Sequence, residues 1–291
     1  MSRATEHRAG WIWASPFLVG AVVFLAVPVG LALYTGFTDY ALIESPLWIG
    51  LDNYREMGDD PVFWQSIRNT AVYTAAAVAL NFLVSLGLAL LLEQRLRGRE
   101  VVRAVVFAPV LVPIVASAIG WMWLYHQEFG LFNVVLRRLG LSGVDFLGDG
   151  RFALMSLVVM GAWVVGSQVL VLTAALRGVP RELIEAAGLD GASAIWRLRA
   201  VVLPAIGPAL MFNLIVSIIW AAQVFAAPLV MTRGGPAGAT QVFTMSIFQN
   251  AFQYGRMGYA SALAWLQFLV ILGLTAIALR LGRRFVQTEA V

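Results

Sequence analysis

The stretch NTAVYTAAAVALNFLVSLGLALLL, residues 69–92, contains no charged side chain. An uncharged apolar run of about 20 residues is long enough to cross a bilayer as an α-helix. Five more runs of this kind lie along the chain, at residues 11–37, 105–125, 152–176, 206–231 and 259–279. The sequence therefore predicts an all-α, polytopic membrane protein with six transmembrane helices.

The composition supports this class. Of the 291 residues 60% are hydrophobic and 12% are charged, against about 25% charged in an ordinary soluble domain. The absence of cysteine excludes disulfides, thiolate metal sites and cysteine nucleophiles. The two histidines, His7 and His126, are too few for a metal cluster, so no cofactor or metal is expected.

The charged residues all lie outside the apolar runs, and their distribution predicts the orientation. Thirteen of the 20 arginines lie before residue 11, after residue 279 or in the connections 93–104 and 177–205. Since cytoplasmic loops carry the excess of basic residues, both termini are predicted to be cytoplasmic. The first run is longer than the core of a signal peptide, about 7–15 residues, and reads as a retained helix. We expect tails at 1–10 and 286–291 around one membrane domain, 11–285.

Prolines inside the runs predict kinks at five positions, although packing irregularity explains any one of them as well. They are Pro16, Pro28, Pro109, Pro113 and Pro228.

The connection 177–205 is the most informative loop. Pro180 stands where a helix can begin, with Glu182 in its first turn and Gly188 at its end. Asp190 is the expected cap of a second short helix, which Leu203 and Pro204 should stop. The alternative is a surface helix whose charges are merely solvated.

Glu185-Ala186-Ala187, followed by Gly191 and by Val201-Val202-Leu203-Pro204, resembles the EAA loop of bacterial ABC importer permeases, with Val201 where Ile is usual. Further landmarks resemble permeases of the maltose and glycerol-phosphate type, in particular the first, maltose-permease F-like, subunit. They are residues 50–54, 60–64, 69–70, 232–236, Thr240, 251–252 and 258–262.

This resemblance implies a type I ABC importer permease fold in a bacterial or archaeal plasma (inner) membrane. Two permeases would form the pore, two cytoplasmic ATPases would drive it, and a substrate-binding protein would deliver the cargo. The EAA segment is then similar to a coupling helix on an ATPase. The residues implied in coupling are Glu185, Ala186, Ala187, Gly191, Leu203 and Pro204. The chain has no lysine and hence no phosphate loop, so ATP must be bound by another chain, and this subunit is not expected to be an enzyme.

The predicted spans contain no ionisable group, which disfavours a proton- or sodium-driven carrier and favours a neutral cargo. Amides, hydroxyls and aromatic rings remain, as sugar recognition requires. Asn213, Ser217, Trp220 and Gln223 share one helix face, and Ser167 and Gln168 lie in the preceding span. The alternative is a stripe of interhelical hydrogen bonds. Gln223 is the first candidate for cargo binding, because related permeases place polar contacts nine residues before the Thr232 element.

The turn Arg233-Gly234-Gly235-Pro236 is expected at the outer mouth of the pore, where it could touch cargo or binding protein. Simple turn chemistry explains it equally well. The leading hypothesis is import of a di- or oligosaccharide. Arg233 keeps glycerol 3-phosphate or a related polyol as an alternative, and a secondary transporter and a non-transporting sensor subunit are the rivals from other classes.

Overall fold

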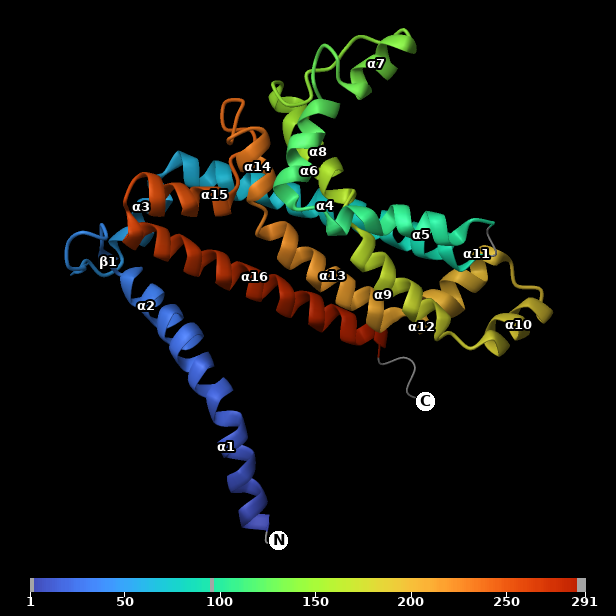
Figure 1. The fold of residues 1–291 in the computed structure, drawn as a ribbon, viewed down its shortest axis with the longest axis horizontal. Helices are drawn as coiled ribbons and strands as arrows, with labels where there is room; N and C mark the ends of the chain where they lie inside the picture. The colour runs from blue at the N-terminus through green and yellow to red at the C-terminus, as the bar shows by residue number, and fades with distance from the viewer. Residues whose placement is uncertain (1–2, 95–96, 287–291) are drawn as a thin grey trace. The chain divides into compact units, whose positions relative to one another are not determined.

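The computed structural model describes residues 3–94 and 97–286, and this part of the chain is mostly helical (Figure 1). The all-α prediction is confirmed, with one small addition: β1 (Thr38–Asp39) pairs antiparallel with β2 (Leu47–Trp48). The α-helices are α1 (Arg3–Ala21), α2 (Val27–Thr35), α3 (Asp52–Asp59), α4 (Pro61–Glu93), α5 (Arg99–Phe107), α6 (Ile114–Leu124), α7 (Leu131–Arg138), α8 (Gly150–Ala162), α9 (Gly166–Arg177), α10 (Arg181–Leu189), α11 (Ala194–Arg197), α12 (Leu203–Ala205), α13 (Gly207–Ala222), α14 (Ala226–Met231), α15 (Phe243–Phe248) and α16 (Met257–Val286). Shorter π- or 3-10-helical segments are η1 (Val22–Ala26), η2 (Ala108–Leu111), η3 (Leu198–Val202) and η4 (Gln249–Gln253).

Four stretches of the described chain are long and apolar enough to cross a membrane: Trp13–Thr35, Pro61–Glu93, Gly207–Met231 and Met257–Gly282. They match the first, second, fifth and sixth predicted spans. The third and fourth are each divided between two helices, which meet at 108° after Leu111 and at 49° after Ala162. The predicted number of six therefore holds when each bent pair counts as one span.

Pro113 marks the sharper of these two bends. Val112 before it is extended, with ψ of 127°, as the residue preceding a proline prefers. Pro113 itself is the N-cap of α6, so the kink expected there is present. Pro16, in contrast, lies inside α1, and the helix runs through it. The 49° bend around Trp163 contains no proline.

The chain divides into two compact units, and the first comprises residues up to Asp60 together with Ser246–Phe268. In this unit the ring of Phe37, just before β1, stacks on the ring of Trp48 in β2, with the centroids 5.6 Å apart. The buried Asn53 amide donates to the carbonyls of Gly36 and Thr38, both at 3.0 Å. Asn53 therefore gives hydrogen-bond partners to two backbone carbonyls in the connection from α2 to β1.

The second unit comprises Pro61–Met245 and the chain from Leu269 onward. Its central element is α4, which packs against α8, α9 and α13 (Figure 1). One buried cluster includes Tyr73, Ala77 and Leu157, and a second, nearer the end of α4, includes Ala89 and Val169. The small residues of α4 let the neighbouring helices approach closely, which is how helices associate in lipid.

Candidate functional site

The connection after α9 forms the predicted short helix, α10. Pro180 precedes it with ψ of 126°, and proline suits a helix start because it has no N–H to leave unpaired. Glu182 lies in the first turn, where the aligned peptide dipoles favour an acidic side chain. The start of α10 is therefore the one that the sequence indicated.

The end of α10 lies farther along than predicted. Gly188 is inside the helix, so its expected role as the terminator was wrong. Gly191 instead takes a left-handed φ of 81°. The N–H groups of Gly191 and Ala192 donate to the carbonyls of Gly188 and Ala187, at 3.1 and 2.9 Å, the bond pattern of a Schellman C-cap. Because glycine adopts this φ without strain, Gly191 sets the direction in which the chain leaves α10.

The second helix of the loop is capped by Ser193, so the prediction of Asp190 was wrong. Ser193 is extended, with ψ of 160°, and its hydroxyl accepts from the Trp196 N–H at 3.2 Å. Asp190 has near-helical torsions and is the C-cap of α10. A cap needs non-helical torsions to turn its oxygen toward the free N–H groups, and only Ser193 has them.

Leu203 and Pro204 were expected to stop this helix, and that prediction was wrong. The backbone continues from α11 through the π-turn η3 into α12, and Pro204 lies in the first turn of α12. Proline is tolerated at such a position. The helix direction changes only at Ile206, whose ψ is 9°, before α13.

The exposed face of α10 combines a carboxylate with apolar groups. Glu185 and Ala186 are exposed, whereas Ala187 is 9% exposed. Four large apolar side chains of the loop are also exposed, namely Leu183, Leu189, Ile195 and Trp196. Large apolar side chains that are exposed in the same loop as a charge occur at sites that contact another protein. The coupling role of these residues stays a prediction.

Three of the six predicted cargo residues form one polar cluster between α9 and α13. The Gln168 side-chain amide donates to the Ser217 hydroxyl at 2.8 Å. The Asn213 amide donates to the Gln168 carbonyl at 3.1 Å. Asn213 and Ser217 are buried. These three residues therefore fit the alternative interpretation, a set of interhelical hydrogen bonds.

The other three predicted cargo residues face outward from this chain. Trp220 is 76% exposed, and Ser167 and Gln223 are also exposed. Gln223 is the C-cap of α13, with φ of −103° and ψ of 17°, and lies in the break before α14. Gln223 is thus exposed at the end of α13, whereas Asn213 and Ser217 are buried within the helix. Whether it contacts cargo stays a prediction.

Four buried side-chain oxygens have no hydrogen-bond partner among the described residues: Thr74 Oγ1, Asn81 Oδ1, Ser117 Oγ and Gln168 Oε1. An unpaired buried polar atom costs about 1–3 kcal/mol. The Gln168 atom belongs to the α9–α13 cluster. That cluster consequently keeps a free acceptor, which water or a hydroxyl-bearing cargo could satisfy.

The predicted glycine-rich turn is part of an ordered loop, residues 232–242. Arg233 and Gly234 have positive φ values of 51° and 84°. The Thr232 and Thr240 hydroxyls lie 2.6 Å apart, and Thr240 also donates to the Gly235 carbonyl at 2.8 Å. Arg233 is exposed and forms no ion pair with any described residue.

The start of α4 holds this loop in place, a role that local sequence patterns did not indicate. The Asn69 amide donates to the carbonyls of Gly238 and Gln241, at 2.8 and 2.9 Å. Gln65 donates to the Ala237 carbonyl, and the Thr70 hydroxyl accepts from the Phe243 N–H. The only signal was that residues 69–70 and 232–236 both belong to the resemblance.

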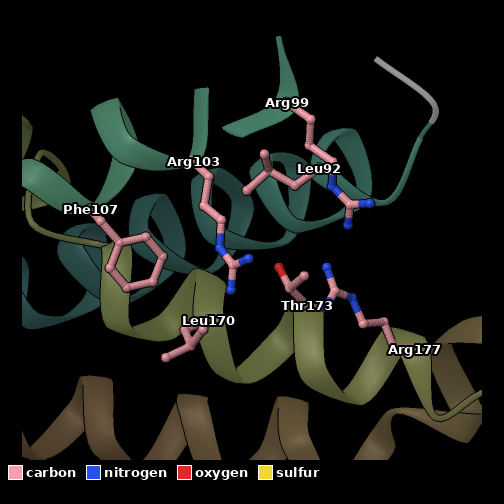
Figure 2. A pocket seen from close by; sticks show the side chains of 7 residues that line it. All are labelled: Leu92, Arg99, Arg103, Phe107, Leu170, Thr173 and Arg177. Atoms are coloured by element: carbon pink, nitrogen blue, oxygen red, sulfur yellow. The ribbon is translucent and has the colours of Figure 1, made fainter. Parts of the chain in front are cut away.

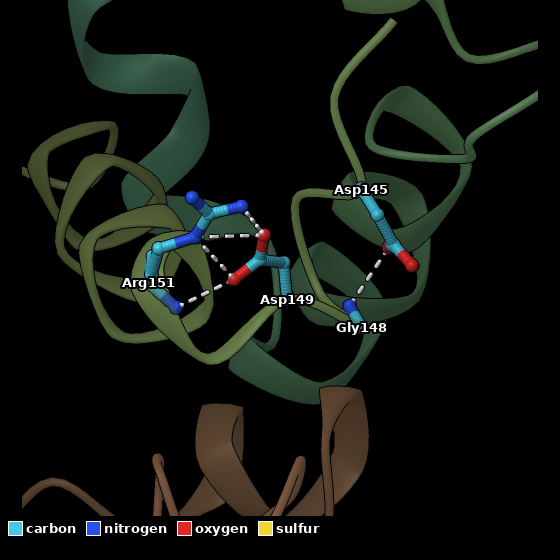
Figure 3. Close-up of polar contacts among 4 residues, drawn as sticks. All are labelled: Asp145, Gly148, Asp149 and Arg151. Carbon is cyan, nitrogen blue, oxygen red and sulfur yellow. Dashed lines mark hydrogen bonds and ion pairs between the residues drawn. The ribbon is translucent and has the colours of Figure 1, made fainter.

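Carboxylates also fix the start of α8, as Figure 3 shows. Asp149 caps the helix by accepting from the Arg151 N–H at 2.9 Å and pairs with its guanidinium at 2.6 Å. The hydrogen bond from the Arg151 side chain is the main reason that the pKa of Asp149 falls to about 2. Asp145 accepts from the Gly148 N–H at 2.8 Å. These contacts position the connection between α7 and α8.

Within residues 3–94 and 97–286, no group of three His, Cys, Asp or Glu side chains could hold a metal ion. The polar groups described above are amides, hydroxyls, carboxylates and arginine guanidiniums. Such groups bind and orient a ligand through hydrogen bonds.

Comparisons with known proteins agree with this picture. The family model described as binding-protein-dependent transport system inner membrane component matches residues 83–287. The trehalose/maltose transport system permease protein MalF of Thermococcus litoralis is 35% identical over 280 residues, which cover 96% of this chain and 95% of that protein. The sulfoquinovosyl glycerol transport system permease protein SmoG of Agrobacterium fabrum is 33% identical over 272 residues, 92% of this chain and 88% of that protein.

A solved structure shares the fold. It is a chain of a bacterial ABC transporter involved in the import of the acidic polysaccharide alginate, with a TM-score of 0.84 and 24% sequence identity. The match covers 96% of this chain and 98% of that chain. The chain therefore has the same overall fold as that solved chain.

Proposed function

Since the chain belongs to the family of binding-protein-dependent transport system inner membrane components, we propose that it is the transmembrane permease subunit of an ATP-driven sugar importer. Its cargo is a di- or oligosaccharide that a substrate-binding protein delivers. It pairs with a second, homologous permease, and two ATPase subunits supply the energy. The relation to a trehalose/maltose permease supports the cargo class.

The observation that carries this proposal is the geometry of α10. A short helix with a glycine C-cap presents Glu185 and Ala186 to solvent beside exposed Leu183. In the proposed machine this helix is the coupling helix, which lies in a cleft of the ATPase. Glu185 meets a basic group there, and the alanines allow close approach. ATP-driven closure of the ATPases then moves α10 and switches the pore between its two states.

The two ends of α4 support the proposed orientation. Asn69, near its start, holds the 232–242 loop, and Glu93, its last residue, pairs with Arg177 at 2.9 Å. A helix of 33 residues is about 50 Å long, enough to cross a bilayer completely. The loop and α10 therefore belong to opposite faces. In the proposed orientation α10 and both termini are cytoplasmic and the loop lies at the outer face, and the arginine excess supports this assignment.

Reconstituted uptake tests the proposal. The chain, purified with its partner permease and ATPases, is placed in liposomes with the binding protein and a radiolabelled disaccharide. Accumulation is expected only with ATP and binding protein together. Accumulation driven by a proton or sodium gradient without ATP would instead show a secondary transporter.

Gln223→Ala is expected to lower cargo-stimulated uptake about tenfold, the effect of losing one or two hydrogen bonds of about 1 kcal/mol each. Assembly of the complex should survive, because the side chain is exposed at a helix break. The measurement is initial uptake rate at subsaturating sugar. Gln94→Ala, also at an exposed glutamine, is the matched control. Equal rates for the two variants would remove Gln223 from the cargo path.

Anionic cargo is a second candidate, because Arg233 is exposed and lies in an ordered loop. Glycerol 3-phosphate or a related polyol would then bind near the outer mouth. If the cargo is anionic, Arg233→Gln should lower the uptake rate more than Gln223→Ala does.

A further inference from the structure

A basic hollow lies between α4, α5 and α9, at the same end of α4 as the α10 loop (Figure 2). Arg99 and Arg103 reach it from α5 and Arg177 from α9. Figure 2 shows the three guanidinium groups turned toward the same space. Apolar side chains of Leu92, Phe107 and Leu170 line it as well.

The positive charge around this hollow exceeds the negative charge that the structure places there. Glu93 Oε1 accepts from Arg99 at 2.7 Å and from Arg177 at 2.9 Å, so one carboxylate serves two arginines. Arg103 is half-buried and has no ion pair with any residue in the described part of the chain. Three arginines and no acidic residue line the hollow, and Glu93 is the carboxylate that pairs with two of them.

A half-buried arginine without a counter-ion is unfavourable, because burial removes water from the guanidinium and no carboxylate takes the place of that water. An anion in the hollow would remove this penalty. Guanidinium groups match the oxygens of a phosphate through paired hydrogen bonds. Basic pockets between transmembrane helices at the membrane surface are known to bind phospholipid headgroups.

We propose that this hollow binds a phosphate group, with Arg103 as the principal contact and Arg99 and Arg177 beside it. The position at the end of the α4 span, beside the exposed side chain of Leu170, suits a phospholipid whose acyl chains lie along that apolar side. A soluble phosphate compound would offer the same chemistry. Since α9 leads directly into the α10 loop, the bound phosphate would brace the base of that loop.

Lipid binding to the full-length chain in neutral detergent tests this inference. Native mass spectrometry measures the affinities for dioleoylphosphatidylglycerol, dioleoylphosphatidylcholine and inorganic phosphate. The anionic lipid is expected to bind at least about tenfold more tightly than the zwitterionic one, and Arg103→Gln should weaken it about tenfold, as loss of a charge-assisted contact predicts. Arg103→Lys should restore part of the affinity. The control is Arg199→Gln, an exposed arginine of the α10 loop, which should change it less than twofold.

Competition between the lipid and inorganic phosphate shows whether the bound phosphate belongs to a phospholipid or to a soluble compound. Arg103-dependent lipid binding that millimolar phosphate does not displace supports a phospholipid. Arg103-dependent binding of inorganic phosphate, with displacement of the lipid, supports a soluble phosphate ligand. If Arg103→Gln and Arg199→Gln bind phosphatidylglycerol equally and neither protein distinguishes the two lipids, the inference is overturned.

Discussion

Replacing Glu185 by lysine is expected to reduce ATP-driven uptake about 30-fold or more. The reversal places a cation against the basic group that the proposed ATPase cleft offers, and loss of one partner of a buried charge pair costs about 2–5 kcal/mol. Glu185 is exposed in this chain, so the subunit itself should still fold. The measurements are uptake and, in the same preparation, the amount of ATPase that co-purifies.

The matched control is Asp190→Lys, which makes the same charge change on the same element. Asp190 is exposed at the C-cap, five residues after Glu185 and therefore about 140° around the helix. A lysine there also suits the negative end of the peptide dipoles. Uptake should remain within about twofold of the unmodified protein. Equal losses in both variants would mean that the general charge of the loop matters and that Glu185 has no specific partner.

Gly166→Ala is expected to destabilise the folded chain by about 1–3 kcal/mol, the usual cost of overpacking a tight contact. A Cβ at this position would lie 2.7 Å from the Val106 carbonyl oxygen and 2.8 Å from Val110 Cγ2. The first of these is backbone and cannot rotate away. We expect the thermal midpoint to fall by roughly 3–10 °C, measured in detergent by tryptophan fluorescence.

Gly87→Ala provides the comparison. Gly87 lies inside α4, and a Cβ there would meet nothing within 4 Å. Replacing a helical glycine by alanine at an open position is neutral or gains about 0.5–1 kcal/mol. If both alanine variants unfold at the same temperature, the close approach of α9 to the end of α5 and to η2 does not limit stability.

The apolar runs predicted the spans well, because the bilayer requires long uncharged helices wherever the chain crosses it. The bends were predicted only in part. Pro113 marks a break because it lacks an N–H and constrains Val112. The bend around Trp163 has no proline to mark it, and the two helices that it joins, α8 and α9, both pack on α4. A single run of sequence does not contain that information.

The same limit explains the errors in the α10 loop. Asp190 and Ser193 are both suitable cap residues, and they lie three positions apart. The choice between them follows from Gly191, whose left-handed turn leaves Asp190 on the first helix and frees Ser193 for the second. A glycine can end a helix or lie within it, so Gly188 and Gly191 could not be distinguished from residue type alone.

The candidate cargo residues show where helical periodicity stops being informative. It placed Asn213, Ser217, Trp220 and Gln223 along one face. It did not indicate that Gln168, 49 residues before Ser217, would bind two of them. In the sequence, Arg99, Arg103 and Arg177 indicated only the orientation of the chain in the membrane. They come together because α5 packs against α9, which the sequence alone does not show.

The central claim is that α10 contacts the ATPase, and site-directed crosslinking tests it most directly. The chain contains no cysteine, so Ala186→Cys introduces a single thiol at an exposed position of α10. With a short bifunctional reagent, the assembled complex should yield a permease–ATPase product that changes in amount when ATP is bound. Val135→Cys, exposed on α7, should yield none. Absence of the product at residue 186, in a complex that retains its ATPase and takes up sugar, would contradict the account.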